Sequence, residues 1–211
     1  VNVVKHELYT PGIYEFKLKP GWVPYENQKK VIEYLVSPGI KKVIDASTGS
    51  GKTVMTIMAL AEINQRTALV VKAMYMERWL DVTAPGNKQA LQFTRKDVMT
   101  VRGSGQLRSL ILLAQSGELH AKFIIISNRT LTMYYEHYNE EGESEEYGFV
   151  KPEDLWKVLD VGVRLIDEAH EHFHACFISD LNTHIPKSVE LSGTLKPDDV
   201  FMDQMYRIMY P

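Results

Sequence analysis

A glycine-bearing turn between an apolar run and a helix-forming stretch is the feature that most constrains the fold of this chain. The turn covers residues 46–53 and reads A-S-T-G-S-G-K-T; it follows the apolar run 42–45 and precedes the stretch 54–61. A strand, such a turn, the pair Lys-Thr and a helix are together typical of a phosphate-binding loop. The strict pattern has Gly where this chain has Ala46, and we expect this small residue to be tolerated. The alternative, a chance glycine-rich turn before a helix, fits the flanking strand and helix less well.

The residue types of the turn match what phosphate binding requires. Successive backbone N–H groups in such a turn point inward and form a nest for phosphate oxygens, and the positive end of the following helix adds to it. Gly49 and Gly51 carry no Cβ, so the backbone can approach the phosphates and adopt a positive φ. We expect Lys52 to reach the β- and γ-phosphates and the hydroxyl of Thr53 to ligate Mg²⁺. The predicted phosphate-binding residues are Thr48, Gly49, Ser50, Gly51, Lys52 and Thr53.

Apolar runs alternate with helix-forming stretches along most of the chain. The predicted strands are 42–45, 67–71, 97–101, 122–127, 163–167 and 188–191. The predicted helices are 26–35, 54–61, a stretch through Trp79, 107–115 and a stretch through Tyr138. Continuous apolar strands that alternate with helices indicate an α/β fold, with a mostly parallel sheet covered by helices on both faces.

Composition sets broad limits on the class of protein. The 211 residues suit one domain with a sizeable core. A net charge of -3 neither indicates nor excludes nucleic-acid binding, because a local basic stripe can lie within a nearly neutral total. Cys176 is the single cysteine, so no internal disulfide can form and we expect a reducing compartment. No apolar run approaches the roughly 18 residues of a membrane span and no signal peptide is visible, so we expect a cytoplasmic protein with no membrane partner.

Two carboxylates lie where another predicted strand ends. Asp167 is the last residue of the strand 163–167, and Glu168 follows it. Because ligands in open α/β sheets bind beyond the carboxyl ends of the strands, we expect Asp167 to face the Mg²⁺ held by Thr53, partly through water. Glu168 would orient and deprotonate an attacking water, and phosphoryl transfer needs mainly such positioning and charge neutralisation. The predicted catalytic residues are therefore Lys52, Asp167 and Glu168, and the predicted metal ligands are Thr53 and Asp167.

Two further patterns each allow a simple and a sharper interpretation. His170, His172, His174 and Cys176 alternate, which on one face of a strand would suggest a zinc site. A helical turn after the strand is the simpler expectation, and residues two apart on a helix point in different directions. The segment 139–147 contains five glutamates, which predicts a solvated, mobile loop. The sharper interpretation of that segment is an insertion that repels nucleic acid or docks a basic partner.

Four motifs, in this order and at this spacing, resemble those of superfamily 2 helicases and translocases. Residues 46–53 resemble motif I, the tetrad D-E-A-H at 167–170 resembles motif II, and S-G-T at 192–194 resembles motif III. Gln28 resembles the glutamine of the Q motif, whose amide reads the adenine edge of ATP in that family. The resemblance implies a RecA-like ATP-binding motor domain over residues 23–211, preceded by an N-terminal hairpin or extension over 1–22.

The resemblance implies a motor that uses ATP and Mg²⁺ to move on or unwind DNA. Its motif III and the short distance from motif II are similar to those of phage DNA-repair and branch-migrating helicases, and also to Swi2/Snf2-type translocases and restriction-enzyme motors. DEAD-box RNA helicases usually carry Asp and Ala where this chain has His170 and Gly193, which argues against that group. An RNA helicase is therefore the alternative and not the first interpretation. A viral source, with the host cytoplasm or nucleoid as location, would follow from the resemblance alone.

Nucleic-acid contacts in that family come from loops after the other strands. By position these loops contain Lys72, Arg102, Gly103, Ser127, Asn128, Arg129 and Thr130. Backbone N–H groups and short hydroxyls there could hold phosphates of one strand, so we expect little reading of base sequence. The family often has Pro-Thr where this chain has Lys72-Ala73, and Arg102 and Arg129 could equally be solvated surface residues.

The resemblance also implies a coupling set and a missing partner domain. The residues that would couple nucleotide state to the grip on nucleic acid are His170, Ser192, Gly193 and Thr194. A second RecA-like domain would supply arginines to the ATP cleft, so we expect the isolated chain to bind ATP weakly and hydrolyse it little. A P-loop kinase is an alternative that leaves Gln28 and motif II unexplained. A non-hydrolysing nucleotide-gated module is another, against which the intact catalytic set argues.

Overall fold

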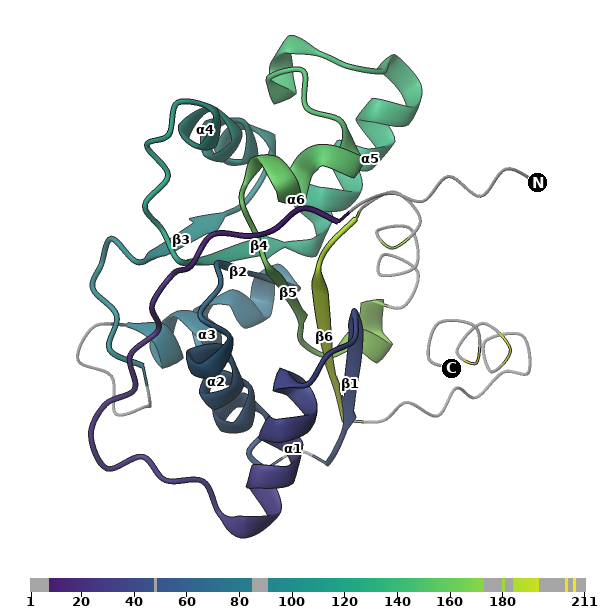
Figure 1. Cartoon of the computed structure of the whole chain (residues 1–211). Helices are drawn as coiled ribbons and strands as arrows, with labels where there is room; N and C mark the ends of the chain where they lie inside the picture. Colours follow the sequence, from purple (N-terminus) through teal and green to yellow (C-terminus); the bar gives the residue numbers. More distant parts are fainter. Residues whose placement is uncertain are drawn as a thin grey trace.

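A six-stranded parallel sheet lies at the centre of the computed structural model (Figure 1). The structure describes residues 8–47, 49–84, 91–172 and 184–193, and the single positions 180, 204 and 207. In chain order the strands are β1 (Lys41–Asp45), β2 (Thr67–Val71), β3 (Val98–Val101), β4 (Phe123–Ser127), β5 (Val163–Ile166) and β6 (Lys187–Ser192). Their order in the sheet is β1-β6-β5-β2-β4-β3, and each neighbouring pair is parallel. The predicted α/β fold with a parallel sheet is therefore confirmed.

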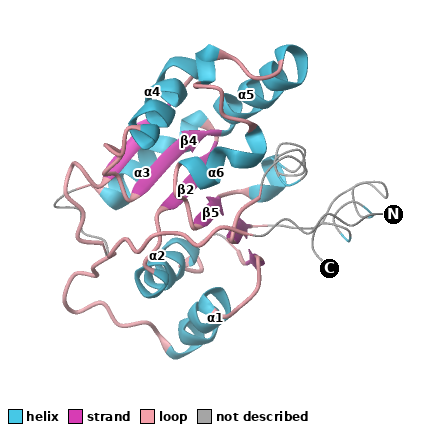
Figure 2. Cartoon of the chain, turned by 45° about the horizontal axis from the view of Figure 1, so that its top comes forward, coloured by secondary structure: helices cyan, strands magenta, loops and turns pink. Residues whose placement is uncertain are grey.

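Helices cover both faces of the sheet (Figures 1 and 2). One face packs against α1 (Glu26–Val36), α2 (Lys52–Ile63) and α3 (Met76–Thr83), and the other packs against α4 (Ser104–Gln115), α5 (Asn128–Glu141) and α6 (Leu155–Val158). Strand β2 shows why its apolar run is continuous. Leu69 and Val71 belong to the core beside α1, α2 and α3, whereas Ala68 and Val70 belong to the core beside α4, α5 and α6. All five residues of the strand are buried.

The strand registers bring the carboxyl ends of the strands to one edge of the sheet. Asp45 at the end of β1 pairs with Ser192 at the end of β6, and Val70 in β2 pairs with Ile166 at the end of β5. The segments that leave these ends are the phosphate-loop sequence after β1, the acidic pair after β5 and the start of motif III at the end of β6. Three motifs that are far apart in the sequence therefore begin at neighbouring strand ends.

The N-terminal segment crosses the domain as an extended chain. Residues 8–22 form no hairpin, and their one bridge is an antiparallel contact between Leu18 and Leu91. Phe16 is buried in the core beside α1 and α2, and the backbone N–H of Tyr14 donates to the carbonyl of Asn64. Of the two forms expected here, a hairpin or an extension, residues 8–22 have the extended one, while the boundary at residue 22 stays a prediction.

A buried arginine holds the amino-terminal side of the sheet together. Arg66, directly before β2, donates from Nε to the carbonyl of Ala121 (2.8 Å) and from its two terminal nitrogens to the carbonyls of Leu159 (2.6 Å) and Leu119 (2.6 Å). Its guanidinium also lies over the ring of Tyr14, 4.2 Å from the centroid. Burial lowers the pKa of Arg66, and the three carbonyls offset part of this loss of hydration.

A second polar cluster lies under the β1–β6–β5 edge. Arg164 is 1% exposed and donates to Asp180 and to the hydroxyl of Ser188, and Lys41 pairs with Asp180 (2.7 Å) and with the buried Glu190 (3.2 Å). Burial by itself would raise the pKa of Asp180, but the charges of Arg164 and Lys41 lower it more, so the net shift is downward.

The acidic segment 139–147 is anchored by an aromatic side chain. Tyr147 is buried and packs against Tyr134, with ring centroids 4.8 Å apart, and against His137. Gln115 of α4 donates to the carbonyl of Gly148. The five glutamates of the segment are exposed, as expected for a solvated segment, but Glu140 and Glu141 end α5, and the short helix η2 (Glu145–Tyr147) packs on α4.

Candidate nucleotide-binding site

The turn after β1 has the backbone conformation predicted for a phosphate-binding loop. Gly49 has φ 85° and Gly51 has φ 86°, both in the left-handed region that favours glycine. Gly51 is the N-cap of α2, so the helix begins at Lys52 and its first N–H groups lie beside the turn. Ser50 is exposed, and Thr48 lies outside the described residues.

The side chain of Lys52 folds over the loop that precedes it. Its Nζ donates to the carbonyl of Ala46 (2.5 Å) and lies 3.4 Å from the carbonyl of Ser47. Thr53, one residue further into α2, is half-buried. An ammonium held by two loop carbonyls can exchange them for phosphate oxygens by rotating its flexible stem, since a lysine head is a compact charge with three donors.

Gln28 contacts the phosphate loop from the first turn of α1. A Cβ added to Gly51 would lie 2.9 Å from Nε2 of Gln28, so this position is open to glycine alone unless the glutamine moves. Oε1 of Gln28 accepts a hydrogen bond from the backbone N–H of Tyr25 (3.0 Å), which fixes the amide orientation. The structure therefore brings the predicted adenine-reading residue and the predicted phosphate loop into contact.

The predicted acidic pair follows β5 directly and is held in place. Asp167 is 5% exposed; its Oδ2 accepts a hydrogen bond from the indole Nε1 of Trp79 (2.7 Å), and its Oδ1 accepts one from the backbone N–H of Glu168 (3.1 Å). Glu168 has φ 52°, a left-handed conformation that is costly for a residue with a Cβ. The backbone at Glu168 is therefore held by its surroundings in a strained conformation, at the position predicted to be catalytic.

Motifs II and III are joined by a side-chain contact. Nδ1 of His170 lies 2.9 Å from Oγ of Ser192 and 3.6 Å from a carboxylate oxygen of Glu168. The carbonyl of Ser192 accepts a hydrogen bond from the backbone N–H of Ala46, where the phosphate loop begins (3.1 Å). Gly193 is half-buried, and Thr194 lies outside the described residues. A continuous set of contacts therefore joins the phosphate loop, Ser192, His170 and Glu168.

Two of the predicted nucleic-acid contacts take part in ion pairs on the surface. Lys72 pairs with Glu171 of the short helix η4 (Ala169–His172) at 2.6 Å, and Arg102 pairs with Glu77 of α3 at 2.5 Å. Both pairs are solvent-exposed, so they are weak enough for a phosphate to compete with the carboxylate.

The remaining predicted contacts gather where β3 and β4 end. The backbone N–H of Gly103 donates to the hydroxyl of Thr130 (2.7 Å), which joins the two loops. Ser127 is the N-cap of α5 and is buried, whereas Arg129 is exposed and its backbone N–H donates to Oδ1 of Asn128. Thr130 is buried as well, so of the four predicted residues at the end of β4 and the start of α5 Arg129 alone is exposed, and Asn128 is half-buried.

The oxygen donors of the site suit a hard divalent cation. Mg²⁺ binds through one or two carboxylates and keeps much of its water, and Thr53 and Asp167 offer a hydroxyl and a carboxylate. Among the described residues, no group of three or more His, Cys, Asp and Glu side chains could hold a metal. The alternating set considered for zinc lies largely outside this range, since His174, Cys176 and the side chain of His172 are not described; η4 itself forms the helical turn that was expected.

Sequence reasoning missed two residues that touch the site, Trp79 and Glu171. Each is brought there by tertiary structure, Trp79 from the middle of α3 and Glu171 from η4.

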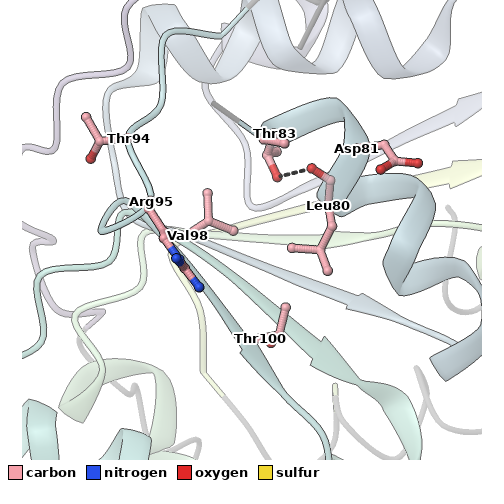
Figure 3. Close-up of a pocket in the computed structure, with 8 residues that line it drawn as sticks. Leu80, Asp81, Thr83, Thr94, Arg95, Val98 and Thr100 are labelled. Atoms are coloured by element: carbon pink, nitrogen blue, oxygen red, sulfur yellow. Dashed lines mark hydrogen bonds between the residues drawn. The ribbon is translucent and has the colours of Figure 1, made fainter. Parts of the chain in front are cut away.

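A separate pocket of about 380 Å³ lies between the end of α3 and the outer strand β3, lined by Leu80, Arg95 and Thr100 among others (Figure 3). Strands β3 and β1 are at opposite edges of the sheet, so this pocket is not part of the candidate nucleotide site.

Comparison with solved structures identifies helicase domains of the same fold. The helicase domain of Hef from Pyrococcus furiosus matches 87% of this chain with a TM-score of 0.54 and 12% identity. The UvsW helicase of bacteriophage T4 matches 90% with a TM-score of 0.54 and 13% identity. A nuclease-deletion mutant of the Type ISP restriction-modification enzyme LlaGI, in complex with a DNA substrate mimic, matches 83% with a TM-score of 0.52 and 12% identity. The chain therefore has the fold of a helicase-type motor domain, as its resemblance to superfamily 2 implies.

The other comparisons add a limit. No protein-family model matches the chain, and no curated protein matches it. The chain spans 36% of the Hef structure, 60% of UvsW and 18% of the LlaGI structure. No helix within the described ranges is long and apolar enough to cross a membrane.

Proposed function

We propose that this chain is the ATP-binding motor domain of a DNA helicase or translocase. One observation carries the proposal: the described parts of all four motifs lie around the carboxyl ends of three adjacent strands. Gln28 contacts the phosphate loop, that loop contacts Ser192, and Ser192 contacts His170. Ligands in open α/β sheets bind at this edge. The motifs would have no reason to meet there if their sequence patterns were accidental.

Each residue of the site then has a role in ATP hydrolysis. The backbone N–H groups of the loop and Lys52 would bind the phosphates, and Gln28 would bind the adenine edge. Thr53 and Asp167 would hold Mg²⁺, which when bound neutralises charge on the phosphates. Glu168 would orient the attacking water and take its proton at a carboxylate oxygen. His170 and Ser192 would pass the state of the nucleotide to the rest of the motor.

The nucleic-acid substrate of the proposal is the DNA backbone. The segments after β2, β3 and β4 present Lys72, Arg102 and Arg129. The LlaGI structure was determined with a DNA substrate mimic, which supports DNA over RNA for a chain of this fold. A second RecA-like domain in the same protein would complete the ATP cleft, so this domain by itself would bind ATP weakly and hydrolyse it little.

The test compares ATP hydrolysis by the full-length protein with single-stranded DNA, duplex DNA, branched DNA and RNA. The Lys52→Ala variant serves as the blank. Stimulation by DNA, greatest with branched or duplex species, would support a DNA motor. Stimulation by RNA alone would make the protein an RNA helicase, and no stimulation by any of the four would remove the motor function.

A further inference from the structure

The indole of Trp79 makes a contact that the proposed mechanism does not yet use. Trp79 is 1% exposed, lies in the middle of α3 and stacks on Phe123 of β4, with ring centroids 6.2 Å apart. Its single donor, Nε1–H, donates to Oδ2 of Asp167 at 2.7 Å. The contact joins two residues that are 88 positions apart in the sequence.

A second tryptophan shows that this bond is more than a requirement of burial. Trp156 of α6 is also fully buried, and its Nε1 has no hydrogen-bond partner among the described residues. The core of this chain therefore tolerates a buried indole without a partner. At Trp79 the donor is directed instead at Asp167, the first of the two carboxylates that follow β5.

The two bonds to Asp167 define the direction of its carboxylate. Oδ2 accepts from Trp79 and Oδ1 accepts from the backbone N–H of Glu168, so rotation about the Cβ–Cγ bond would break both contacts. Each oxygen still has a lone pair available, because a carboxylate accepts about four hydrogen bonds or ligand contacts in all. The carboxylate can thus bind a cation or its water without losing either support.

We propose that Trp79 is a positioning residue for the cation site, which orients Asp167 to bind Mg²⁺ or its water. The inference rests on the proposed function, since it takes Asp167 as the Mg²⁺ ligand. Groups that support a metal ligand commonly change metal affinity by about 10- to 100-fold when they are removed. Trp79 has one bond to a carboxylate that has a second support, so we expect the lower end of that range.

The first test measures how binding of a fluorescent ADP analogue to this chain depends on Mg²⁺ concentration. Trp79→Phe keeps an aromatic ring and removes the donor; Trp156→Phe is the matched control, because it removes a buried indole that has no hydrogen-bond partner in the described part of the chain. We expect Trp79→Phe to need about 10-fold more Mg²⁺ for half-maximal effect, while analogue binding without Mg²⁺ stays as in Trp156→Phe. An unchanged Mg²⁺ requirement, or an equal loss of binding with and without Mg²⁺, would overturn the inference.

The second test needs no variant of Trp79. The three tryptophans give three indole N–H signals in a nitrogen–proton correlation spectrum, and Trp22→Phe and Trp156→Phe assign two of them, leaving Trp79 by elimination. The Trp79 signal should shift in Asp167→Asn and on addition of Mg²⁺ with ADP; a signal that responds to neither would overturn the inference. Wild-type chain that binds ADP without any Mg²⁺ dependence would instead refute the proposed function, and the response to Asp167→Asn would still decide whether the bond exists.

Discussion

Replacing Arg66 by Met should cost more stability than almost any other single change in this fold. Arg66 supplies three hydrogen bonds to carbonyls of residues 119, 121 and 159, which belong to segments before β4 and β5. Methionine keeps an unbranched apolar stem but leaves all three acceptors without this donor. At about 1 to 1.5 kcal/mol for each bond lost, the free energy of unfolding should fall by about 3 to 5 kcal/mol. Typical domains have only about 5 to 15 kcal/mol in total.

The assay is urea unfolding of the chain, followed by circular dichroism. With a slope of about 2 to 3 kcal/mol per molar urea, the predicted loss lowers the midpoint by about 1 to 2.5 M. Arg108→Met is the matched control, because Arg108 is exposed on α4 and its replacement should change stability by less than about 0.5 kcal/mol. If the two variants differ by less than about 1 kcal/mol, the guanidinium does not hold the segments together as argued.

Three further predictions concern charge and coupling. Burial raises the pKa of Asp180 but its ion pairs lower it more, so its carboxylate stabilises the fold above about pH 4 and this stabilisation is lost as pH falls. Asp180→Asn should therefore flatten the decline of the urea midpoint between about pH 5 and pH 3. A decline parallel to that of the wild type would contradict this prediction. Ser192→Ala removes the hydrogen bond to His170, so DNA-stimulated ATP turnover of the full-length protein should fall about fivefold while nucleotide affinity stays the same. A reduced nucleotide affinity would show damage to the site instead. In titrations of this chain with DNA at several salt concentrations, Lys72→Ala should lower the slope of log affinity against log salt by about 1, whereas Glu171→Gln should raise affinity by releasing Lys72. Equal behaviour of those two variants would exclude a phosphate contact there.

Local patterns in the sequence were sufficient to predict the fold class, and they also predict a nucleotide site, which stays a prediction. The strand 67–71 was predicted with the bounds that the structure has, because a strand buried on both faces needs a continuous apolar run. The strand–turn–helix arrangement of the candidate phosphate loop could be predicted because its parts are adjacent in the chain: β1 ends at Asp45, and two glycines at positive φ and the start of α2 lie within 46–53. The sequence left a hairpin and an extension open at the N-terminus, because alternating apolar residues fit an extended segment packed on the domain as well as they fit a paired strand.

Tertiary structure alone decided which side chains meet across the site. Three pairs of residues meet although their members are separated by more than 20 positions in the sequence: Trp79 and Asp167, Gln28 and Gly51, and His170 and Ser192. Each pair meets because the strand order β1-β6-β5-β2-β4-β3 places the two segments side by side. No local preference distinguishes a tryptophan that supports a carboxylate from one that only fills the core, as Trp79 and Trp156 show. The local sequence determines which secondary structure each segment can form. A hydrogen bond between segments depends instead on the relative position of two backbones, which the packed sheet and its helices determine.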